Sequence, residues 1–472
     1  MLFSSTLFLF AFLPLVLSAY LLVARLGLGV PARNALLLVA SLVFYAWGET
    51  GYVAILLVSI VANHVFGLWI DRAGTGSERR RALVLAVATN LAGLCAFKYA
   101  NFLVDGWNAV LSPLGVPALA LAPVHLPIGI SFFTFQAITY VVDVYRRDAP
   151  VDRNPLRVAL YISLFPQLIA GPIVRYRWIA SELRQRTAAA EDIAAGIRRF
   201  TIGLGKKLLI ANTLAVPADR IFAIPPDDLS AAVAWLGGFC YALQIYFDFS
   251  GYSDMAIGLG RMLGFHFPEN FLHPYTSRSV REFWRRWHVT PSTWFRDYLY
   301  IPLGGSRGTA PRTYVNLLAV FVLCGLWHGA SLTFLVWGLL HGALMVAERL
   351  GLGALLERLP RALARTYTLT AVLLAWVVFR ADDLPHAGRY LEALFTPGGG
   401  TDLAPLLDAK VGLALAAGAL GSTPWLDALR RRFGDNSTTW TAARFAALNG
   451  ILVACAMALA SGTHNPFIYF RF

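Results

Sequence analysis

His328 is the residue of this sequence whose chemistry and position most favour a catalytic role. It stands in the segment GLWHGAS, at the end of one apolar run and just before another. An ionisable side chain within membrane-spanning sequence is costly, which makes it a functional candidate by default. A neutral imidazole can also take the proton of a hydroxyl that attacks a thioester. A packing histidine bonded to a nearby carbonyl explains the position equally well, so position alone leaves both interpretations open.

The glycines around His328 suggest a helix break inside the bilayer. Gly325 and Gly329 permit close approach of backbone or ligand on either side of the Leu-Trp-His triplet. The preceding run, Tyr314–Trp327, gives roughly 21 Å of helix, which is short of a full crossing. His341 follows in WGLLHGA. If the helix is continuous, about 20 Å separates the two histidines, so we expect His341 to be a lining or structural residue.

A second candidate segment, EFWRRWHVTPSTWFRDYLYIPLGG, contains His288 between clustered arginines and tryptophans. The guanidiniums of Arg285, Arg286 and Arg296 can grip phosphate, and Trp287 offers a stacking surface. Alternatively, the segment is an interfacial amphipathic stretch with an aromatic belt and snorkelling arginines. Composition alone slightly favours the second interpretation.

Further polar residues lie in or beside apolar runs. Asp248 and Asp254, in DFSGYSD, suit acid/base or cation-binding work, or equally the capping of a helix that begins near Asp254. Gln136 belongs to PIGISFFTFQ, a membrane segment broken by Pro and Gly that suggests cavity-lining backbone. The four cysteines share no short spacing and indicate neither disulfides nor a zinc site, so we expect no metal.

Composition places the chain in a membrane. Of 472 residues, 57% are hydrophobic and only 14% are charged, and the mean hydropathy is +0.59. Soluble domains contain about 25% charged residues. The 40 Lys+Arg against 27 Asp+Glu lie in short loops between apolar runs, as the positive-inside rule produces, and this placement argues against nucleic-acid binding. The basic excess can also recruit an anionic cytosolic ligand such as a coenzyme A thioester. We expect one polytopic domain over residues 1–472.

Apolar runs of about 20 residues are candidate membrane spans. The longer ones are Leu2–Ala24, Tyr52–Ile70, Ala82–Phe102, Arg157–Val174, Ala231–Gly260, Ser331–Ala347, Thr366–Val378 and Phe445–Ala460. Shorter ones are Ala35–Trp47, Pro127–Val144, Phe200–Val216, Tyr314–Trp327 and Val411–Gly421. The sequence therefore predicts an all-α polytopic membrane protein with about 11–13 transmembrane or re-entrant helices. Between them, Gln244–Arg307 is dense in aromatics, charge, Gly and Pro, which predicts irregular, site-forming backbone.

Several long motifs, in order, resemble the membrane-bound O-acyltransferases, and among them the branch of alginate O-acetyltransferase membrane subunits. The matching stretches are PIGISFFTFQ, FPQLIAGPIVR, YFDFSGYSDMAIGLGRMLGF, NFLHPY, FWRRWHVTPSTWFRDYLYIPLGG, GLWHGASLTFLVWGLLHG and the terminal PFIYFRF. The resemblance implies that His328 matches the family's catalytic histidine and His288 its second signature polar position. It also implies a funnel-shaped helical bundle whose tunnel joins a cytosolic donor to an extracytoplasmic acceptor, with a site-forming core at about 127–350.

The resemblance further implies a multi-pass protein of the bacterial inner membrane with no permanently bound cofactor. Acetyl-CoA is the expected donor, a polysaccharide the acceptor, and a periplasmic protein of the SGNH-hydrolase type the partner. His328 is expected as general base or, alternatively, as transient acyl carrier. The other residues expected at the site, as partner, orienting or donor-binding groups, are His288, Trp287, Arg285, Arg286, Arg296, Asp248, Gln136, Trp327 and His341. Two rival hypotheses are a transporter or flippase without chemistry and a scaffold for a secretion complex.

Overall fold

The structure, a computed structural model, describes residues 1–396, 398, 400–433 and 438–462, so the terminal PFIYFRF motif lies outside the described residues. Every regular element in these ranges is helical, and eight helical segments are long and apolar enough to cross a membrane. They are Phe8–Arg25, Gly29–Ala46, Val53–Arg72, Gly76–Lys98, Ala310–His328, Leu332–Arg358, Arg361–Arg380 and Thr438–Ala460. The prediction of an all-α polytopic membrane protein is confirmed.

The chain divides into two compact units, Met1–Ile197 with Ala256–Pro268, and Arg198–Met255 with Glu269–Phe472. The boundaries fall within α10 (Ala190–Gly205) and α12 (Ala231–Met262). The first unit contains η1 (Phe8–Phe12), α1 (Leu13–Arg25), α2 (Gly29–Ala46), α3 (Val53–Arg72), α4 (Gly76–Lys98), α5 (Ala100–Leu111), η2 (Ser112–Leu114), α6 (Ile130–Arg146), α7 (Pro155–Ser163), α8 (Phe165–Leu168) and α9 (Tyr176–Ile179). The expectation of a single domain stays a prediction.

The second unit contains the remaining helices, which include both candidate histidine segments. They are η3 (Lys206–Ala211), α11 (Asn212–Phe222), η4 (Pro226–Asp228), η5 (Pro274–Thr276), α13 (Val280–Arg286), α14 (Val289–Phe295), η6 (Arg296–Tyr300), α15 (Ala310–His328), α16 (Leu332–Ala347), η7 (Glu348–Leu352), α17 (Gly353–Arg358), α18 (Arg361–Arg380), α19 (Leu384–Ala393), η8 (Ala404–Leu406), α20 (Ala409–Gly421), α21 (Trp425–Phe433) and α22 (Thr438–Ala460).

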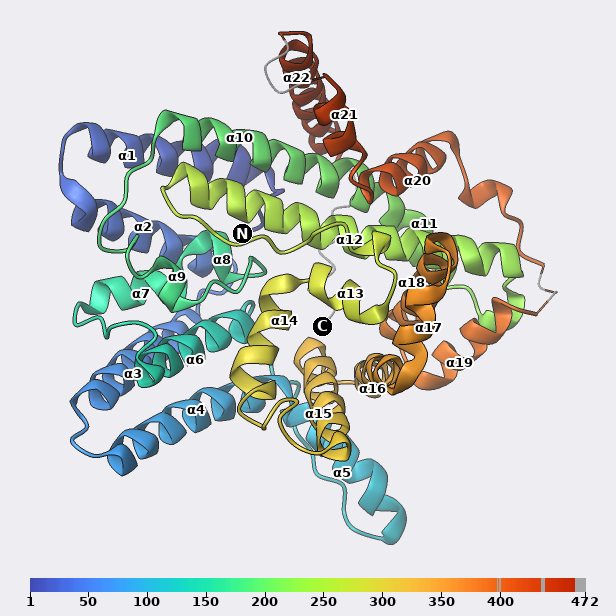
Figure 1. The fold of residues 1–472 in the computed structure, drawn as a ribbon, viewed down its shortest axis with the longest axis horizontal. Coiled ribbons are helices and arrows are strands. Elements are labelled where there is room, and N and C mark those ends of the chain that lie inside the picture. Colours follow the sequence, from blue (N-terminus) through green and yellow to red (C-terminus); the bar gives the residue numbers. More distant parts are fainter. Residues whose placement is uncertain (397, 399, 434–437, 463–472) are drawn as a thin grey trace. The chain divides into compact units, whose positions relative to one another are not determined.

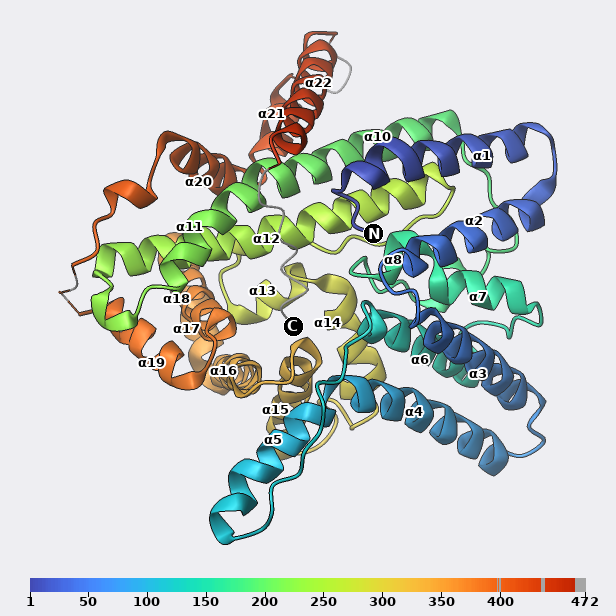
Figure 2. The same cartoon turned by 180° about the vertical axis from the view of Figure 1, so that it is seen from behind.

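Within the first unit, α3, α4 and α6 lie side by side (Figures 1 and 2). Every residue of Ile130–Val144 in α6 is buried, including the polar Gln136 and Asp143, so protein surrounds this helix on every face. Gly67 of α3 lets the Tyr140 ring approach, since a Cβ at Gly67 would lie 2.6 Å from it. The amides of Asn63 and Asn90 join α3 to α4 through reciprocal hydrogen bonds of 3.0 and 2.8 Å. These contacts satisfy polar groups that lipid could not satisfy.

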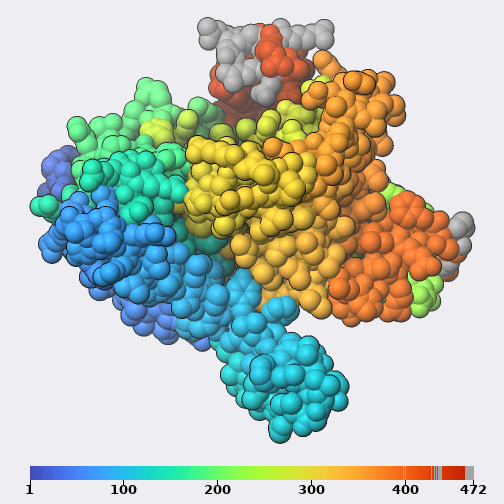
Figure 3. Space-filling model, turned by 60° about the horizontal axis from the view of Figure 1, so that its bottom comes forward, coloured from blue at the N-terminus to red at the C-terminus, as the bar shows by residue number. Residues whose placement is uncertain are grey.

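The α5 hairpin stands out from the other helices of the first unit (Figure 3). None of its helical residues, Ala100–Leu111, is buried. Its returning segment is held by side-chain amides: Asn101 donates to the Ala122 carbonyl at 3.2 Å, and Asn108 donates to the Leu119 carbonyl at 2.9 Å.

The expected span Arg157–Val174 is wrong. The helix α7 covers only nine residues and ends at Ser163, and Leu164 has ψ 113°. Pro166 has no backbone N–H to donate to the Ile162 carbonyl, so α7 cannot continue through this position, and α8 begins as a separate helix at Phe165. The Gln167 amide then donates to the Tyr161 carbonyl at 2.6 Å, which closes the broken segment on itself.

In the second half of the chain, the motif DFSGYSD is regular helix. The helix α12 is continuous over 32 residues and includes both Asp248 and Asp254. The alternative of a helix that begins near Asp254 is therefore wrong, and so is the expectation of irregular backbone from Gln244 onward. Irregular backbone begins only after Met262, where α12 ends.

Both carboxylates of this motif are paired with cations from the preceding helical segments. The Lys207 ammonium lies 2.7 Å from the Asp248 carboxylate, and both side chains are at most 3% exposed. The Asp254 carboxylate lies 2.7 Å from the Lys206 ammonium and 2.8 Å from the Arg199 guanidinium. Buried charges need such partners, because an isolated ion would lose its hydration without compensation. The pairs tie η3 and α10 to α12 within the second unit.

The chain reverses immediately after His328. The helix α15 ends at His328, Gly329 is extended, and α16 begins at Leu332 with the Ser331 hydroxyl accepting from the Thr333 N–H at 3.1 Å. The helix break expected near His328 is present. A continuous helix from His328 to His341 is wrong, and so is the axial separation calculated from it.

Two glycines allow the helices of this hairpin to touch. A Cβ at Gly325 would lie 2.2 Å from the Phe334 carbonyl oxygen, and one at Gly338 would lie 2.3 Å from the Phe321 carbonyl oxygen. Small residues permit such close crossings of membrane helices, where dispersion replaces the hydrophobic effect as the driving force.

We predict that Lys207→Met destabilises the protein by about 3–5 kcal/mol, because it leaves the Asp248 charge buried without its partner. The double variant Lys207→Met/Asp248→Leu should recover most of this loss. The measurement is the apparent melting temperature of the detergent-solubilised protein.

The matched control is Asp227→Asn, which removes one member of the exposed Arg389–Asp227 pair, 3.6 Å apart. Its effect should stay below about 1 kcal/mol, as for other surface pairs. Equal melting temperatures for Lys207→Met and Asp227→Asn would contradict the role assigned to the buried pair.

Candidate active site

His288 occupies a strained turn between two short helices. It directly precedes α14, with φ 44° and ψ 55°, a left-handed conformation that is uncommon for a residue other than glycine. Asn270 holds the turn: its carbonyl accepts from the Val289 N–H at 2.9 Å, and its side-chain oxygen accepts from the Thr290 N–H at 3.1 Å. Ser253 of α12 accepts in turn from the Asn270 amide at 2.9 Å. Backbone strain supported in this way is typical of functional sites.

His328 and His288 face each other within one buried cluster. Their ring centroids are 6.4 Å apart, and the two side chains belong to residues that are 7% and 3% exposed. His328 ends α15, and His288 follows α13. Both of these helices contact α16, the hairpin partner of α15. This spacing suits two groups that act on one small substrate group bound between them.

Aromatic rings wall the space around His328. The centroid of its ring lies 4.8 Å from Trp327, 5.2 Å from Trp337 and 5.5 Å from Phe379. On the other side, Phe271 stacks on His288 at 5.8 Å. Such walls exclude water and strengthen electrostatic interactions inside the cluster. We refer to these rings together with the two histidines as the histidine cage.

His341 lies behind the cage. Trp337 packs between the two histidines of the hairpin, with its centroid 5.2 Å from His328 and 4.9 Å from His341. The Trp284 indole N–H donates to His341 Nδ1 at 3.2 Å. His341 thus fixes Trp284 and Trp337, and its expected place among the site residues stays a prediction.

Trp287 backs the cage on the α13 side. Its ring stacks on Phe283 at 5.4 Å and lies 5.0 Å from Trp376 and 5.1 Å from Phe271. Because Phe271 stacks on His288, Trp287 can orient that imidazole through one intervening ring.

A cavity of about 690 Å³ adjoins this cluster, and four arginines line it. They are Arg281, Arg285, Arg296 and Arg349. Cys324, one helical turn before His328, also lines it, as does Trp284, which bonds His341. We refer to it as the donor cavity.

The charge of the donor cavity is largely uncompensated. Arg296 pairs with Asp297 at 2.6 Å, whereas Arg281, Arg285 and Arg349 form no ion pair among the described residues. Guanidiniums in this arrangement are suited to bind phosphate oxygens.

Two predicted site residues, Arg286 and Asp248, lie elsewhere in the second unit, whereas Gln136 belongs to the first unit and its place at the site stays a prediction. Arg286 pairs with Glu282 at 2.8 Å and lines a different cavity from its neighbour Arg285. Asp248 pairs with Lys207, although the next residue of α12, Phe249, lies 5.6 Å from His288. Gln136 is fully buried in α6 of the first unit, where neither amide atom has a hydrogen-bond partner among the described residues.

Sequence reasoning missed Trp337, Phe379, Arg281 and Arg349. Helical spacing could have identified some of these residues. Arg281 and Arg285 are four residues apart and share a face of α13, while Arg286 points to another face. Trp337 and His341 are also four apart on α16. Phe379 and Arg349 come from segments that only the tertiary fold brings to the site.

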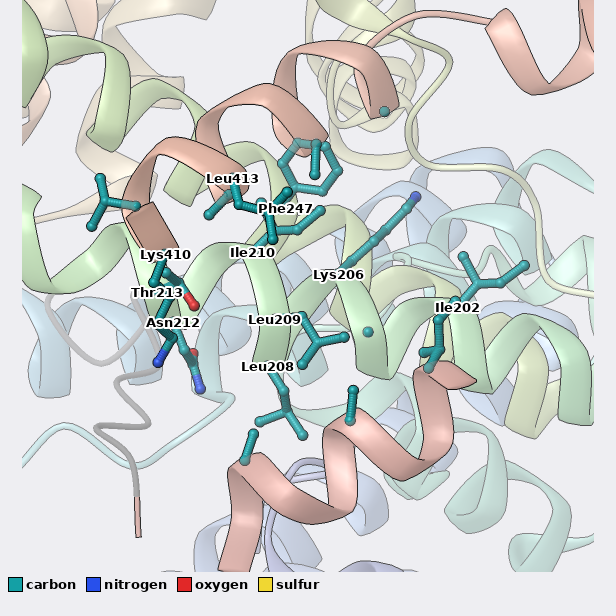
Figure 4. A pocket seen from close by; sticks show the side chains of 18 of the residues that line it. Ile202, Lys206, Leu208, Leu209, Ile210, Asn212, Thr213, Phe247, Lys410 and Leu413 are labelled. Atoms are coloured by element: carbon teal, nitrogen blue, oxygen red, sulfur yellow. The ribbon is translucent and has the colours of Figure 1, made fainter. Parts of the chain in front are cut away.

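Another cavity of the second unit has no histidine in its lining. It measures about 760 Å³, and Figure 4 shows Phe247, Leu209 and Leu413 among its mainly apolar lining. Lys206 and Lys410 are its basic lining residues, and Lys206 is engaged by Asp254. We assign it no catalytic role.

Comparisons with known proteins show which family this chain is similar to. A model of the membrane-bound O-acyltransferase family matches residues 130–379. The chain is 42% identical to a probable alginate O-acetylase of Pseudomonas putida over 493 aligned positions that cover 100% of both proteins. It is 46% identical to the corresponding protein of Pseudomonas aeruginosa over 84% of this chain and 75% of that one. A peptidoglycan O-acetyltransferase of Helicobacter pylori is 37% identical, over 84% of this chain and 80% of that one.

We predict that Gly325→Ala destabilises the protein by about 1–3 kcal/mol, since the new Cβ would overlap the Phe334 carbonyl and force α15 and α16 apart. The apparent melting temperature in detergent measures this effect. Gly412→Ala, in α20, is the control, because nothing lies within 4 Å of its Cβ position. It should be neutral or stabilising by up to about 1 kcal/mol. Equal shifts in the two variants would contradict the close crossing.

Proposed function

Because this chain belongs to the membrane-bound O-acyltransferase family, we propose that it carries an acetyl group from cytosolic acetyl-CoA toward hydroxyls of an exported polysaccharide such as alginate. Membership of this family makes the chain an O-acyltransferase. Its long apolar helices make it a multi-pass membrane protein. The observation that carries the proposal is the pair of histidines in one aromatic cage beside an arginine-lined cavity.

His328 acts as the general base in this proposal. It takes the proton of the acceptor hydroxyl, and the oxygen attacks the thioester carbonyl. The C–S bond then breaks, and the leaving thiolate receives the proton from the imidazolium. His288, across the 6.4 Å gap, holds the reacting group in place. Positioned proton transfer of this kind contributes roughly 10²–10⁴-fold to a rate.

The donor binds with its phosphates in the donor cavity. Arg281, Arg285 and Arg349 form no competing ion pair there, so their guanidiniums are available to phosphate oxygens. The thioester end then extends past Cys324 toward His328, one helical turn away on α15.

The names of the relatives support an exported glycan as the acceptor. Their names describe acetylation of alginate and of peptidoglycan, which are both exported glycans. We place this chain accordingly in the bacterial inner membrane, where a first half-reaction moves the acetyl group from the cytosolic thioester to the hydroxyl that enters the histidine cage. A periplasmic partner of the SGNH-hydrolase type completes transfer to the glycan in the second.

His328→Ala should reduce acetyl transfer at least about 10²-fold while membrane insertion and folding persist. The assay uses purified protein with its periplasmic partner in liposomes loaded with alginate, and radiolabelled acetyl-CoA added outside. His386→Ala, a histidine change in α19, is the control and should retain transfer. Wild-type transfer by His328→Ala would contradict its role as base. Loss of affinity alone, with acetylated product still formed, would favour a transporter.

Arg285→Gln should raise the KM for acetyl-CoA by roughly 10- to 100-fold with little change in kcat, since a charge-assisted hydrogen bond to phosphate contributes about 1.5–3 kcal/mol. Arg286→Gln removes the same charge one residue away, from the other cavity, and should leave KM unchanged. Steady-state kinetics in the liposome assay separate the two constants. Equal KM changes in both variants would contradict the assignment of the donor cavity.

A further inference from the structure

A second basic cavity lies on the other face of α13 and takes no part in the proposed reaction. It measures about 590 Å³ and is lined by five arginines: Arg278, Arg286, Arg361, Arg365 and Arg431. They come from three separate parts of the chain, around α13, at the start of α18 and in α21. We refer to it as the arginine cavity.

The positive charge of this cavity exceeds what the described residues neutralise. Its single acidic lining residue, Glu282, lies 2.8 Å from Arg286 and 3.9 Å from Arg278. Arg361, Arg365 and Arg431 form no ion pair with any described residue, and all three are exposed. Like charges four residues apart, as in Arg361 and Arg365, destabilise a helix unless an anion lies between them.

The start of α18 adds to this potential. Arg361 and Arg365 occupy the first two turns of a 20-residue helix whose N-terminal dipole end is positive. Thr276 and Thr423 also line the cavity and can donate hydroxyl protons to an anion. Charge, donors and shape together fit a phosphate-bearing group.

An apolar groove continues from the arginine cavity along α18. It measures about 430 Å³, and its large lining residues are Trp235, Phe239, Leu243, Leu369, Leu373 and Trp376. Thr423 lines both spaces, and Thr366 of the groove directly follows Arg365 of the cavity. The arginine cavity and the groove beside it, on a membrane-spanning helix, match the two parts of a lipid. The arginines match an anionic headgroup, and the apolar groove matches an acyl chain.

We propose that this pair of spaces is a binding site for an anionic phospholipid. The phosphate and headgroup lie in the arginine cavity, between Arg361, Arg365 and Arg431. One acyl chain lies in the groove along α18 and reaches Trp376. A soluble anion would use the arginines but leave the groove without an occupant, so the groove favours the lipid.

The groove ends against the rear wall of the histidine cage. Trp376, which lines the groove, packs on Trp337 with centroids 5.8 Å apart and on Trp287 at 5.0 Å. Trp337 in turn contacts His328 at 5.2 Å. The bound acyl chain therefore supports the ring that positions the imidazole.

The test is a titration of the purified full-length protein in detergent, followed by native mass spectrometry. The probes are phosphatidylglycerol, phosphatidylcholine and the soluble headgroup glycerophosphoglycerol. Wild type should bind phosphatidylglycerol at least about tenfold more tightly than either other probe. The double variant Arg361→Gln/Arg365→Gln should weaken this binding roughly 25-fold, about fivefold for each arginine near the headgroup.

The matched control is Arg312→Gln/Arg358→Gln, which removes the same charge from exposed positions outside both spaces. It should bind phosphatidylglycerol as wild type does. Thr370→Phe fills the groove without touching the arginines, and it should weaken lipid binding while leaving glycerophosphoglycerol unaffected. Monodisperse elution and unchanged melting of each variant confirm folding.

Two results would overturn the proposal. Equal losses of phosphatidylglycerol binding in the two double variants would show that the lipid is attracted by the overall charge of the protein and not by the arginine cavity. Glycerophosphoglycerol that binds as tightly as the lipid, with Thr370→Phe neutral, would assign the arginine cavity to a soluble anion. Acetyl transfer is not measured here, so the outcome is independent of the proposed reaction.

Discussion

The close crossing of α15 and α16 is the contact on which the site depends. Gly325 and Gly338 bring the two backbones together, and Gly329 lets the chain reverse directly after His328. The reversal places Trp337 of α16 against the imidazole at the end of α15. A longer or looser connection would leave His328 at a frayed helix end, where neither a wall nor a second histidine could orient it. Backbone packing thus positions the chemistry.

The seven-residue helix α13 contributes arginines to two different cavities of the second unit. One face presents Arg281 and Arg285 to the donor cavity, and the other presents Arg286 to the arginine cavity, which Arg278 also lines from just before the helix. Its aromatic residues, Phe283 and Trp284, pack against His341 between these faces. A single short helix therefore contributes arginines to two separate cavities while it supports the rear of the histidine cage. Its arginines are not interchangeable, because helical periodicity sends adjacent residues to different chambers.

Much of this arrangement could be predicted from residue types and motifs. Apolar runs indicate a polytopic helical protein, and the glycines around His328 indicate a break. Hydropathy wrongly predicted a membrane span at Arg157–Val174, because Pro166 interrupts the helix there. The polar residues Asp248 and Asp254 wrongly suggested irregular backbone, because cations pair with both carboxylates within a regular helix. The aromatic walls could not be predicted, because their residues are distant in sequence and meet only through tertiary packing.

The central claim is that an acetyl thioester reaches the gap between His288 and His328 from the donor cavity. The most direct measurement is an electron cryomicroscopy structure of the protein with a non-hydrolysable acetyl-CoA analogue. The account predicts phosphate density beside Arg281, Arg285 and Arg349, and the acyl carbonyl between the two imidazoles. Phosphate density in the arginine cavity, with no ligand density in the histidine cage, would contradict it.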